Sequence, residues 1–355
     1  MDSLKNDHGQ AGYSLIELLL AMSFMVVIMG VVFTFARDSM RTNVVTMEMT
    51  EAQESVRSAH EMLNRDLISA GDGLNGINNI SLPRLFVTSY LAVNPVLDPS
   101  NNNMVQLCVV TSDNDVPANT PVLLTNPAVT VRSNPVRTDR LTIMEADPNF
   151  TPIALPANAW TPSGANLSVS PADIGRFNIG DIYFITSAAG ATFGAVTNVN
   201  NGDDVIFANS DTLGINAPGD GGPINVVTNA GTMPSSMTRM LMIHYFVDSN
   251  GLLIRRVFGS PGAGGFRDSV IAEHVVDLQF RFGLNLFNGN GTIMQPVAQL
   301  ANATQQVAVR QVEVTLTVET THPVLNGTRP RVTMTSTTSV RNMQFRQSLQ
   351  PGTGG

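Results

Sequence analysis

Apolar side chains fill one long run near the start of the chain. No charged residue occurs from Leu18 to Ala36, and about 20 apolar residues suffice for a helix to cross a bilayer. Beyond Arg37 the apolar positions recur at spacings of three and four, the period of one helix face; they are Val45, Met49, Ala52, Val56, Ala59, Leu63, Leu67 and Ala70. This pattern predicts one continuous helix over 13–70 that ends at Gly71-Asp72-Gly73.

After residue 71 the pattern changes to short apolar and β-branched runs separated by Asn, Gly, Pro, Ser and Thr, which is typical of strands and turns. The weaker expected strands are 85–90, 104–110, 140–145, 181–186, 204–208 and 224–228. The stronger ones are 239–248, 252–258, 275–284, 307–320 and 331–345. Residues 312–319 alternate apolar and polar, as in a strand with one solvated face, and 248–251 (Asp-Ser-Asn-Gly) predict a hairpin turn.

Together these elements predict an α+β protein, with a long N-terminal helix packed on a β-rich globular head. The first half of the helix is expected to be transmembrane and the second half amphipathic. The expected regions are a polar leader (1–12), the transmembrane helix half (13–36), the amphipathic half (37–71), a loop-rich β insertion (72–235), a C-terminal antiparallel sheet (236–346) and a disordered tail (347–355).

Composition argues against several classes of function. Charged residues make up 14% of the chain and the net charge is -8; without a basic patch, nucleic acid is not an expected partner. The only lysine is Lys5, so the chain after the leader offers no Schiff-base or phosphate-loop lysine. Cys108 stands alone, which excludes an intrachain disulfide and is consistent with a buried strand residue.

Candidate catalytic and metal-binding residues do not form a recognisable pattern. The five histidines lack metal-ligand spacing, and His60 and His244 are expected to be packed or surface residues. The acidic turns 113–115 and 201–204 offer oxygen ligands, but neither has the spacing of a twelve-residue calcium loop. We therefore expect no catalytic residue, no metal site, no cofactor and no enzymatic activity.

A single carboxylate, Glu17, lies near the start of the apolar run. An ionised carboxylate at membrane depth costs a few kcal/mol, and a plain anchor would gain from leucine at this position. This indicates a functional role for Glu17. The alternative is a carboxylate that extends to the nearby membrane surface.

The residues around it, Gly12-Tyr13-Ser14-Leu15-Ile16-Glu17 followed by the apolar run, resemble the class III signal of type IV prepilins and type II secretion pseudopilins. The resemblance implies cleavage after Gly12 by prepilin peptidase and N-methylation of Tyr13, with Glu17 as the fifth mature residue. In that family the glutamate pairs with an N-terminal amine and sets the register between subunits. The leader departs from the family pattern because Lys5 is outweighed by two aspartates and arginines follow the span, so the positive-inside bias is weak or reversed.

A second resemblance lies in the C-terminal half. Residues 271–280, 309–316 and 331–342 are similar to the terminal strands of PilW-type minor pilins. This implies a PilW-like minor pilin that takes part in initiation or tip assembly of a type IV pilus. The implied partners are prepilin peptidase, other minor pilins, the major pilin, the inner-membrane assembly platform and membrane lipid. The implied location is the bacterial inner membrane, single-pass with the head in the periplasm, and then the pilus or cell surface.

Other functions remain open at this point. A J-type pseudopilin of a type II secretion system shares the same general plan. A pilus-tip adhesin would use residues 91–235 for binding and would tolerate their deletion without loss of assembly. A membrane-tethered extracytoplasmic enzyme is a further alternative, as is an ordinary secretory signal cleaved after Thr34-Phe35-Ala36.

Overall fold

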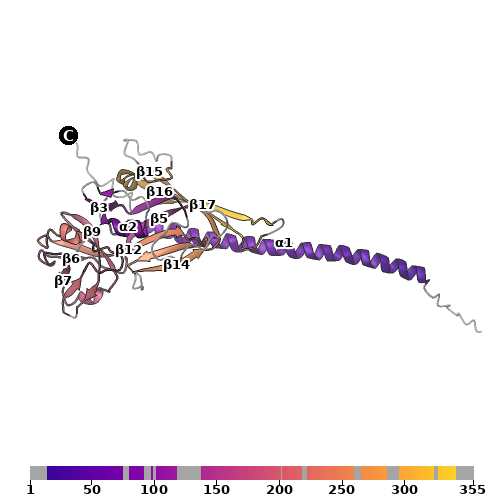
Figure 1. Ribbon diagram of the computed structural model, residues 1–355, viewed down its shortest axis with the longest axis horizontal. Coiled ribbons are helices and arrows are strands. Elements are labelled where there is room, and N and C mark those ends of the chain that lie inside the picture. Colours follow the sequence, from indigo (N-terminus) through magenta and orange to yellow (C-terminus); the bar gives the residue numbers. More distant parts are fainter. Residues whose placement is uncertain are drawn as a thin grey trace, which may run out of the picture.

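The computed structural model describes residues 14–74, 80–91, 97–98, 101–117, 137–200, 202–217, 222–259, 265–285, 296–323 and 327–340. Gly12, Tyr13 and the expected tail 347–355 lie outside these residues. The described part consists of one long N-terminal helix and a β-rich head that also contains short helices (Figure 1). The expected α+β composition is therefore confirmed.

The elements in chain order are α1 (Leu15–Ser69), β1 (Ile80–Pro83), α2 (Arg84–Tyr90), β2 (Leu97–Asp98), β3 (Asn101–Leu107), β4 (Val110–Pro117), β5 (Arg137–Ala146), β6 (Ile153–Leu155), β7 (Asn166–Ser168), η1 (Ile174–Arg176), β8 (Ile182–Ser187), β9 (Gly190–Ala195), β10 (Asn198–Val199), β11 (Asp204–Ile206), α3 (Pro223–Val227), β12 (Ser235–Val247), β13 (Leu253–Phe258), β14 (Phe266–Ala272), β15 (Val275–Leu284), α4 (Ala303–Val307), β16 (Val309–Glu319) and β17 (Arg331–Ser339).

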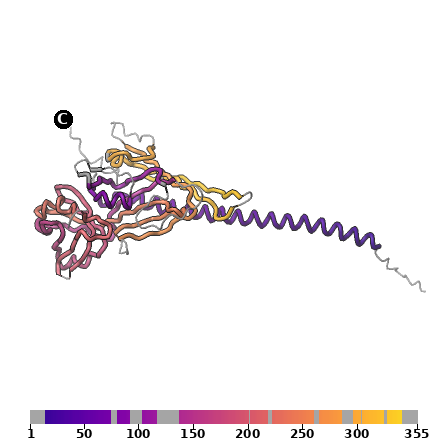
Figure 2. The backbone as a smooth tube through the Cα atoms, viewed as in Figure 1, coloured from indigo at the N-terminus to yellow at the C-terminus, as the bar shows by residue number. Residues whose placement is uncertain are grey.

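Helix α1 is a rod whose first half projects away from the head and whose second half packs on it (Figures 1 and 2). Its 55 residues, at about 1.5 Å per residue, span roughly 80 Å. The positions that pack on the head are those of the predicted face. Val45 and Met49 are half-buried, and the following members are buried: Ala52, Val56, Ala59, Leu63, Leu67 and Ala70.

The end of α1 is tied directly to the sheet. Gly71 and Gly73 have φ of 83° and 70°, a conformation that favours glycine. The Gly71 N–H donates to the Met144 carbonyl at 2.8 Å, and the Ala146 N–H donates to the Asp72 carbonyl at 2.9 Å. A Cβ on Gly73 would lie 2.3 Å from the Ala146 Cβ. The glycines that stop the helix therefore also allow the chain to approach β5 closely.

Strand β12 connects the two ends of the head. Its first residues pair with β8 and β6, and its later residues pair with β5 and β13. It lies within an 11-stranded sheet of order β14-β13-β12-β8-β9-β1-β3-β2, from which β4, β5 and β6 branch. Hydrogen bonds thus cross the expected division at 235/236, because β5 and β8 from the 72–235 region pair with a strand of the C-terminal region.

A second, three-stranded sheet of order β15-β16-β17 covers another side of α1. The strand pairs β15–β16 and β16–β17 are both antiparallel. The expected alternation holds over 312–316, where Val312, Val314 and Leu316 are buried while Glu313 and Thr315 are half-buried. It is wrong for 317–319, where Thr317 and Glu319 are buried as well. The expected C-terminal sheet is therefore divided, with β12–β14 in the large sheet and β15–β17 in the small one.

The described residues of the head form two hydrophobic cores. The larger core includes the docked half of α1 and residues of the 11-stranded sheet and of the β15–β17 sheet, whereas a third sheet, of order β10-β11-β7, contributes to the smaller core. The smaller core extends from Phe150 to Met237 and surrounds Trp160 and Phe207. We call the part built on this smaller core the distal lobe, because it lies at the end of the head opposite the free half of α1 (Figure 2).

Most of the stronger strand predictions are confirmed, including the hairpin, in which the Gly251 N–H donates to the Asp248 carbonyl at 3.1 Å. Two weaker predictions are wrong, since 85–90 and 224–228 form the helices α2 and α3. Each helix follows or begins at a proline, and apolar runs this short do not distinguish strand from helix by periodicity. The expected strand 104–110 is interrupted at Cys108, which is buried between β3 and β4.

Candidate functional site

The first turn of α1 holds Glu17, the one expected site residue among those described. Ser14 is the N-cap, and its hydroxyl accepts from the Ile16 N–H at 3.4 Å. The Glu17 Oε2 accepts from the Ser14 N–H at 3.1 Å, which completes a capping box. The carboxylate therefore folds back toward the start of the chain, where the helix dipole favours negative charge. Gly12 and Tyr13 lie outside the described residues.

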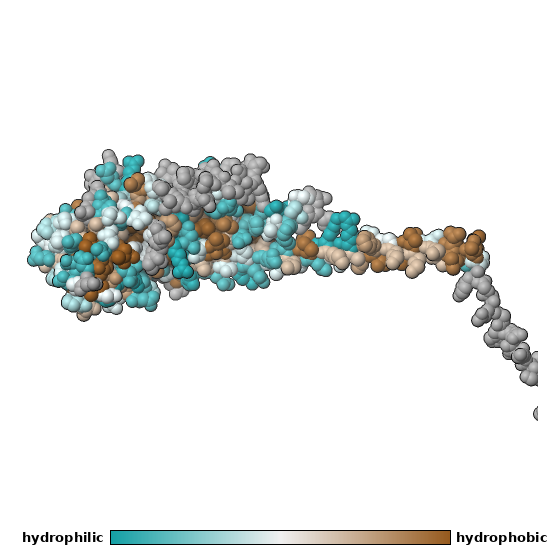
Figure 3. All heavy atoms as spheres, turned by 60° about the horizontal axis from the view of Figure 1, so that its bottom comes forward, coloured by the Kyte–Doolittle hydropathy of each residue, from teal (hydrophilic) through white to brown (hydrophobic). Residues whose placement is uncertain are grey.

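The half of α1 that follows Glu17 is an uncovered apolar surface. Every residue from Leu15 to Phe35 is exposed, and the free half is predominantly apolar in Figure 3. Its hydroxyls are satisfied within the helix, since Ser23 and Thr34 donate to the Leu19 and Gly30 carbonyls, each at 2.8 Å. Such internal pairing is what a hydrocarbon environment requires. By length and composition α1 can cross a membrane.

The apolar surface continues past the first charged residues. Met40, Val44 and Met47 expose 69%, 57% and 65% of their surface, and their spacing places them on one side of the helix. Thr42 and Thr46 donate to carbonyls four residues earlier, at 2.9 Å each. The segment between the span and the head therefore also presents a surface of low polarity.

Where α1 meets the head, a buried carboxylate fixes the helix to the sheet. Asp66 is 3% exposed, and its Oδ2 accepts from the Tyr245 hydroxyl and the Arg255 Nε, each at 2.6 Å. The sequence analysis missed Asp66. A detectable signal existed, because Asp66 is three residues after Leu63 and so falls on the apolar face of the predicted helix.

His60 supplies a second polar contact between α1 and the head. The His60 ring is 1% exposed; its Nδ1 lies 2.8 Å from the Ser336 Oγ and its Nε2 lies 3.1 Å from the Met334 carbonyl oxygen. Burial lowers the pKa of His60, which favours a neutral ring that donates to the carbonyl. The expectation that His60 is a packed residue is confirmed.

A polar row crosses the large sheet on the opposite face. Thr142, His244, Arg256 and Asp268 are direct neighbours on four adjacent strands. Arg256 binds Asp268 through two bonds of 2.7 Å, and its guanidinium lies 3.8 Å from the centroid of the Phe266 ring. His244 is buried as well, and its pKa lies well below the ordinary value because of burial and the nearby arginines. The row links four neighbouring strands, and its His244 side chain is not exposed to solvent.

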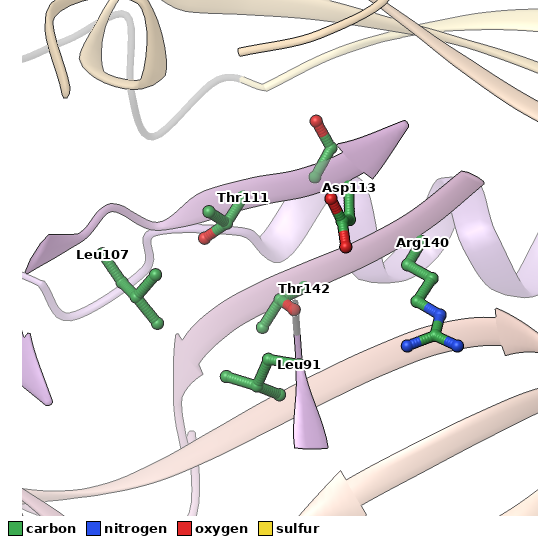
Figure 4. A pocket seen from close by; sticks show the side chains of 7 residues that line it. Leu91, Leu107, Thr111, Asp113, Arg140 and Thr142 are labelled. Carbon is green, nitrogen blue, oxygen red and sulfur yellow. The ribbon is translucent and has the colours of Figure 1, made fainter. Parts of the chain in front are cut away.

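Beside this row lies a cavity of about 10 Å³, lined by Leu91, Leu107, Thr111, Ser112, Asp113, Arg140 and Thr142 (Figure 4). That volume is at the lower limit for a single water molecule. Among the described residues, no group of three or more His, Cys, Asp or Glu has the geometry of a metal site. The expected acidic turn 113–115 lies instead within β4, where Asp115 pairs with the Arg137 Nε at 2.9 Å.

A larger hollow of about 140 Å³ borders the distal lobe and includes Ile179, Thr197, Asp211 and Leu213. None of the described residues that line it is aromatic. The Asp211 carboxylate accepts from the Ile215 and Asn216 N–H groups at 2.7 and 3.0 Å, so it already stabilises its own turn.

Comparisons with protein-family models, with curated proteins and with solved structures find no match to this chain. The start of α1, its uncovered apolar half and its junction with the head are therefore the features that bear on function.

Proposed function

We propose that this protein is a membrane-anchored filament subunit of the type IV prepilin class. The specific assignment is a PilW-like minor pilin that takes part in initiation or tip assembly of a type IV pilus. The observation that carries the proposal is Glu17 in the first turn of a long helix whose free, apolar half is exposed from Leu15 to Phe35. The runner-up is a J-type pseudopilin of a type II secretion system.

The uncovered half of α1 requires an apolar partner. Burial of apolar surface is favourable by about 25 cal/mol per Å², so a row of exposed Leu, Met, Val and Phe side chains strongly favours lipid or neighbouring helices over water. A subunit that first resides in the inner membrane and then enters a filament meets both environments. The head would then lie in the periplasm and later at the pilus or cell surface.

The position of the Glu17 carboxylate supports a role in subunit register. It accepts from the Ser14 N–H, one residue after Tyr13. If cleavage after Gly12 makes Tyr13 the N-terminus, its amine lies close to this carboxylate along the chain. The same carboxylate would be available to the amine of an adjacent subunit, and pairing the two charges in hydrocarbon offsets the cost of placing either there alone.

Processing can be tested through the single lysine. Because Lys5 lies in the expected leader, cleavage after Gly12 removes the only lysine side chain. We expect protein recovered from membranes to begin at N-methylated Tyr13, by intact mass and N-terminal sequencing, and to lose lysine-directed labelling. The Gly12→Leu variant should keep both the leader and the label. A chain that begins at Arg37, or normal maturation of Gly12→Leu, would contradict the proposal.

The role of Glu17 predicts a separation of processing from assembly. Glu17→Ala should be cleaved normally but enter filaments or initiation complexes at least about tenfold less efficiently, since tenfold corresponds to only about 1.4 kcal/mol. Incorporation is measured by quantitative immunoblotting of sheared filaments and of cross-linked minor-pilin complexes. The matched control is Glu51→Ala, an exposed glutamate on the same helix. Equal incorporation of the two variants would remove the register role.

The alternatives need different tests. Loss of surface pili on gene deletion indicates the pilus, whereas loss of secreted enzymes with pili intact indicates the type II machine. The adhesin alternative cannot be tested by deleting 91–235, because that deletion removes β5 and β8, the partners of β12. Point substitutions on the surface of the distal lobe, followed by binding assays on assembled pili, are the appropriate test.

A further inference from the structure

The end of α1 is bound to β5 on either side of Glu145, through the Gly71 N–H to the Met144 carbonyl and the Ala146 N–H to the Asp72 carbonyl, and a second carboxylate, Asp66, is near enough to act electrostatically on Glu145. Asp66 comes from the last turns of the helix, and Glu145 comes from β5 beneath it. Both oxygens of the Asp66 carboxylate have hydrogen-bond donors. Oδ2 accepts from the Tyr245 hydroxyl and the Arg255 Nε at 2.6 Å each, and Oδ1 accepts from the Arg65 Nε at 3.4 Å. Glu145 is half-buried and lies within reach of the Ser69 hydroxyl of α1, which also donates to the Arg65 carbonyl at 3.1 Å.

One oxygen of Glu145 has no donor. Its Oε2 is fully buried and makes no hydrogen bond, which is an expensive arrangement for an ionised carboxylate. Arg255 is engaged with Asp66 and only 18% of its side chain is exposed, whereas 67% of the Arg65 side chain is in solvent. The site therefore holds two carboxylates and only one largely buried cation.

We propose that Glu145 makes the joint between α1 and the head responsive to protons. When Glu145 is neutral, the last turns of α1 pack firmly on β5, β12 and β13. When Glu145 ionises, a second negative charge is confined beside Asp66 and the joint loosens. This inference goes beyond the proposed function, because it concerns how rigidly the rod carries its head and holds whether or not the rod enters a filament.

The groups around Glu145 shift its pKa in both directions, and burial has the largest effect. Burial raises the pKa of Glu145 and the Asp66 charge raises it further, whereas the Ser69 hydrogen bond, Arg255 and Arg65 lower it; the net direction is upward from 4.5. Further along the same strands, Arg239 is occupied by Asp147 and Asp181 at 2.6 and 3.2 Å. Because the folded pKa exceeds the unfolded one, the stabilisation is complete below the ordinary value and is lost as pH rises through the folded pKa.

Hydrogen–deuterium exchange of the full chain in detergent micelles, at pH 4 and pH 8 with correction for intrinsic rates, tests this. In the native protein, amides of 62–74 and 143–147 should exchange about five- to tenfold faster at pH 8, relative to amides of 182–187 in β8. Amides nearer Asp139 are left out of the comparison, because burial raises the pKa of that carboxyl to about 6. Glu145→Gln should remove this difference, whereas Glu61→Gln, an exposed position on the same helix, should retain it.

Two results would overturn the inference. One is an unchanged pH dependence in Glu145→Gln. The other is a native protein whose joint and β8 respond equally to pH, a comparison that decides the matter even if the variant does not fold. Glu145→Asp, which retains a carboxylate, should retain the pH dependence.

Discussion

Replacement of Asp66 by alanine is expected to lower the free energy of unfolding by about 3–5 kcal/mol, the usual loss when one partner of a buried ion pair is removed. Arg255 would lose its carboxylate, and the Tyr245 hydroxyl would lose its acceptor. Tyr245 is fully buried, so water cannot readily replace that acceptor. Urea unfolding of the full chain in detergent, followed by circular dichroism, measures the change.

Two variants make the Asp66 result specific. Asp66→Asn keeps an oxygen for Tyr245 but removes the charge that binds Arg255, so its loss should fall between those of alanine and the native residue. Glu61→Ala changes an exposed acid on the same helix and should remain within about 0.5 kcal/mol of the native protein. An Asp66→Ala variant as stable as Glu61→Ala would show that the contact contributes nothing to stability.

The second large effect is expected from Leu63→Ala, which should lower the free energy of unfolding of the head by about 2–5 kcal/mol through lost burial and a residual cavity. Leu63 is 0% exposed in the core between α1 and the sheets. The same measurement as for Asp66 applies.

The helix itself supplies the matched control. Leu20→Ala is chemically identical, but Leu20 is 60% exposed and belongs to the stretch from Leu15 to Phe35 in which every residue is exposed. It should leave the unfolding of the head unchanged in detergent. If both substitutions destabilise the head equally, the division of α1 into a free half and a docked half is wrong.

The helix could be predicted in detail because its signals are local. The apolar period runs from Val45 to Ala70, and the glycines that end it are adjacent in the chain. The hairpin between β12 and β13 was predictable for the same reason, since its turn residues are consecutive. Short segments could not be assigned from their pattern, because a few apolar residues fit the period of a strand or of a helix. The segments 85–90 and 224–228, predicted as strands, are helices for this reason.

The residues of the candidate site were also predictable only where the signal is local in the sequence. Glu17 could be singled out because a lone carboxylate in an apolar run is conspicuous, and its role in assembly remains a prediction. Asp66 was missed, although its place on the apolar face of the helix was visible. Its partners on the sheet were not visible, since Tyr245 and Arg255 belong to two separate strands, β12 and β13.

By itself, the sequence determined the long helix, its apolar and amphipathic halves, and the carboxylate at its start, because each depends on residues within a few turns of one another. Only the tertiary structure decided that β12 joins the two expected regions of the head and that Asp66 binds Tyr245 and Arg255. These contacts follow from the order of strands in the large sheet. That order is set by packing between distant segments, which no local period encodes.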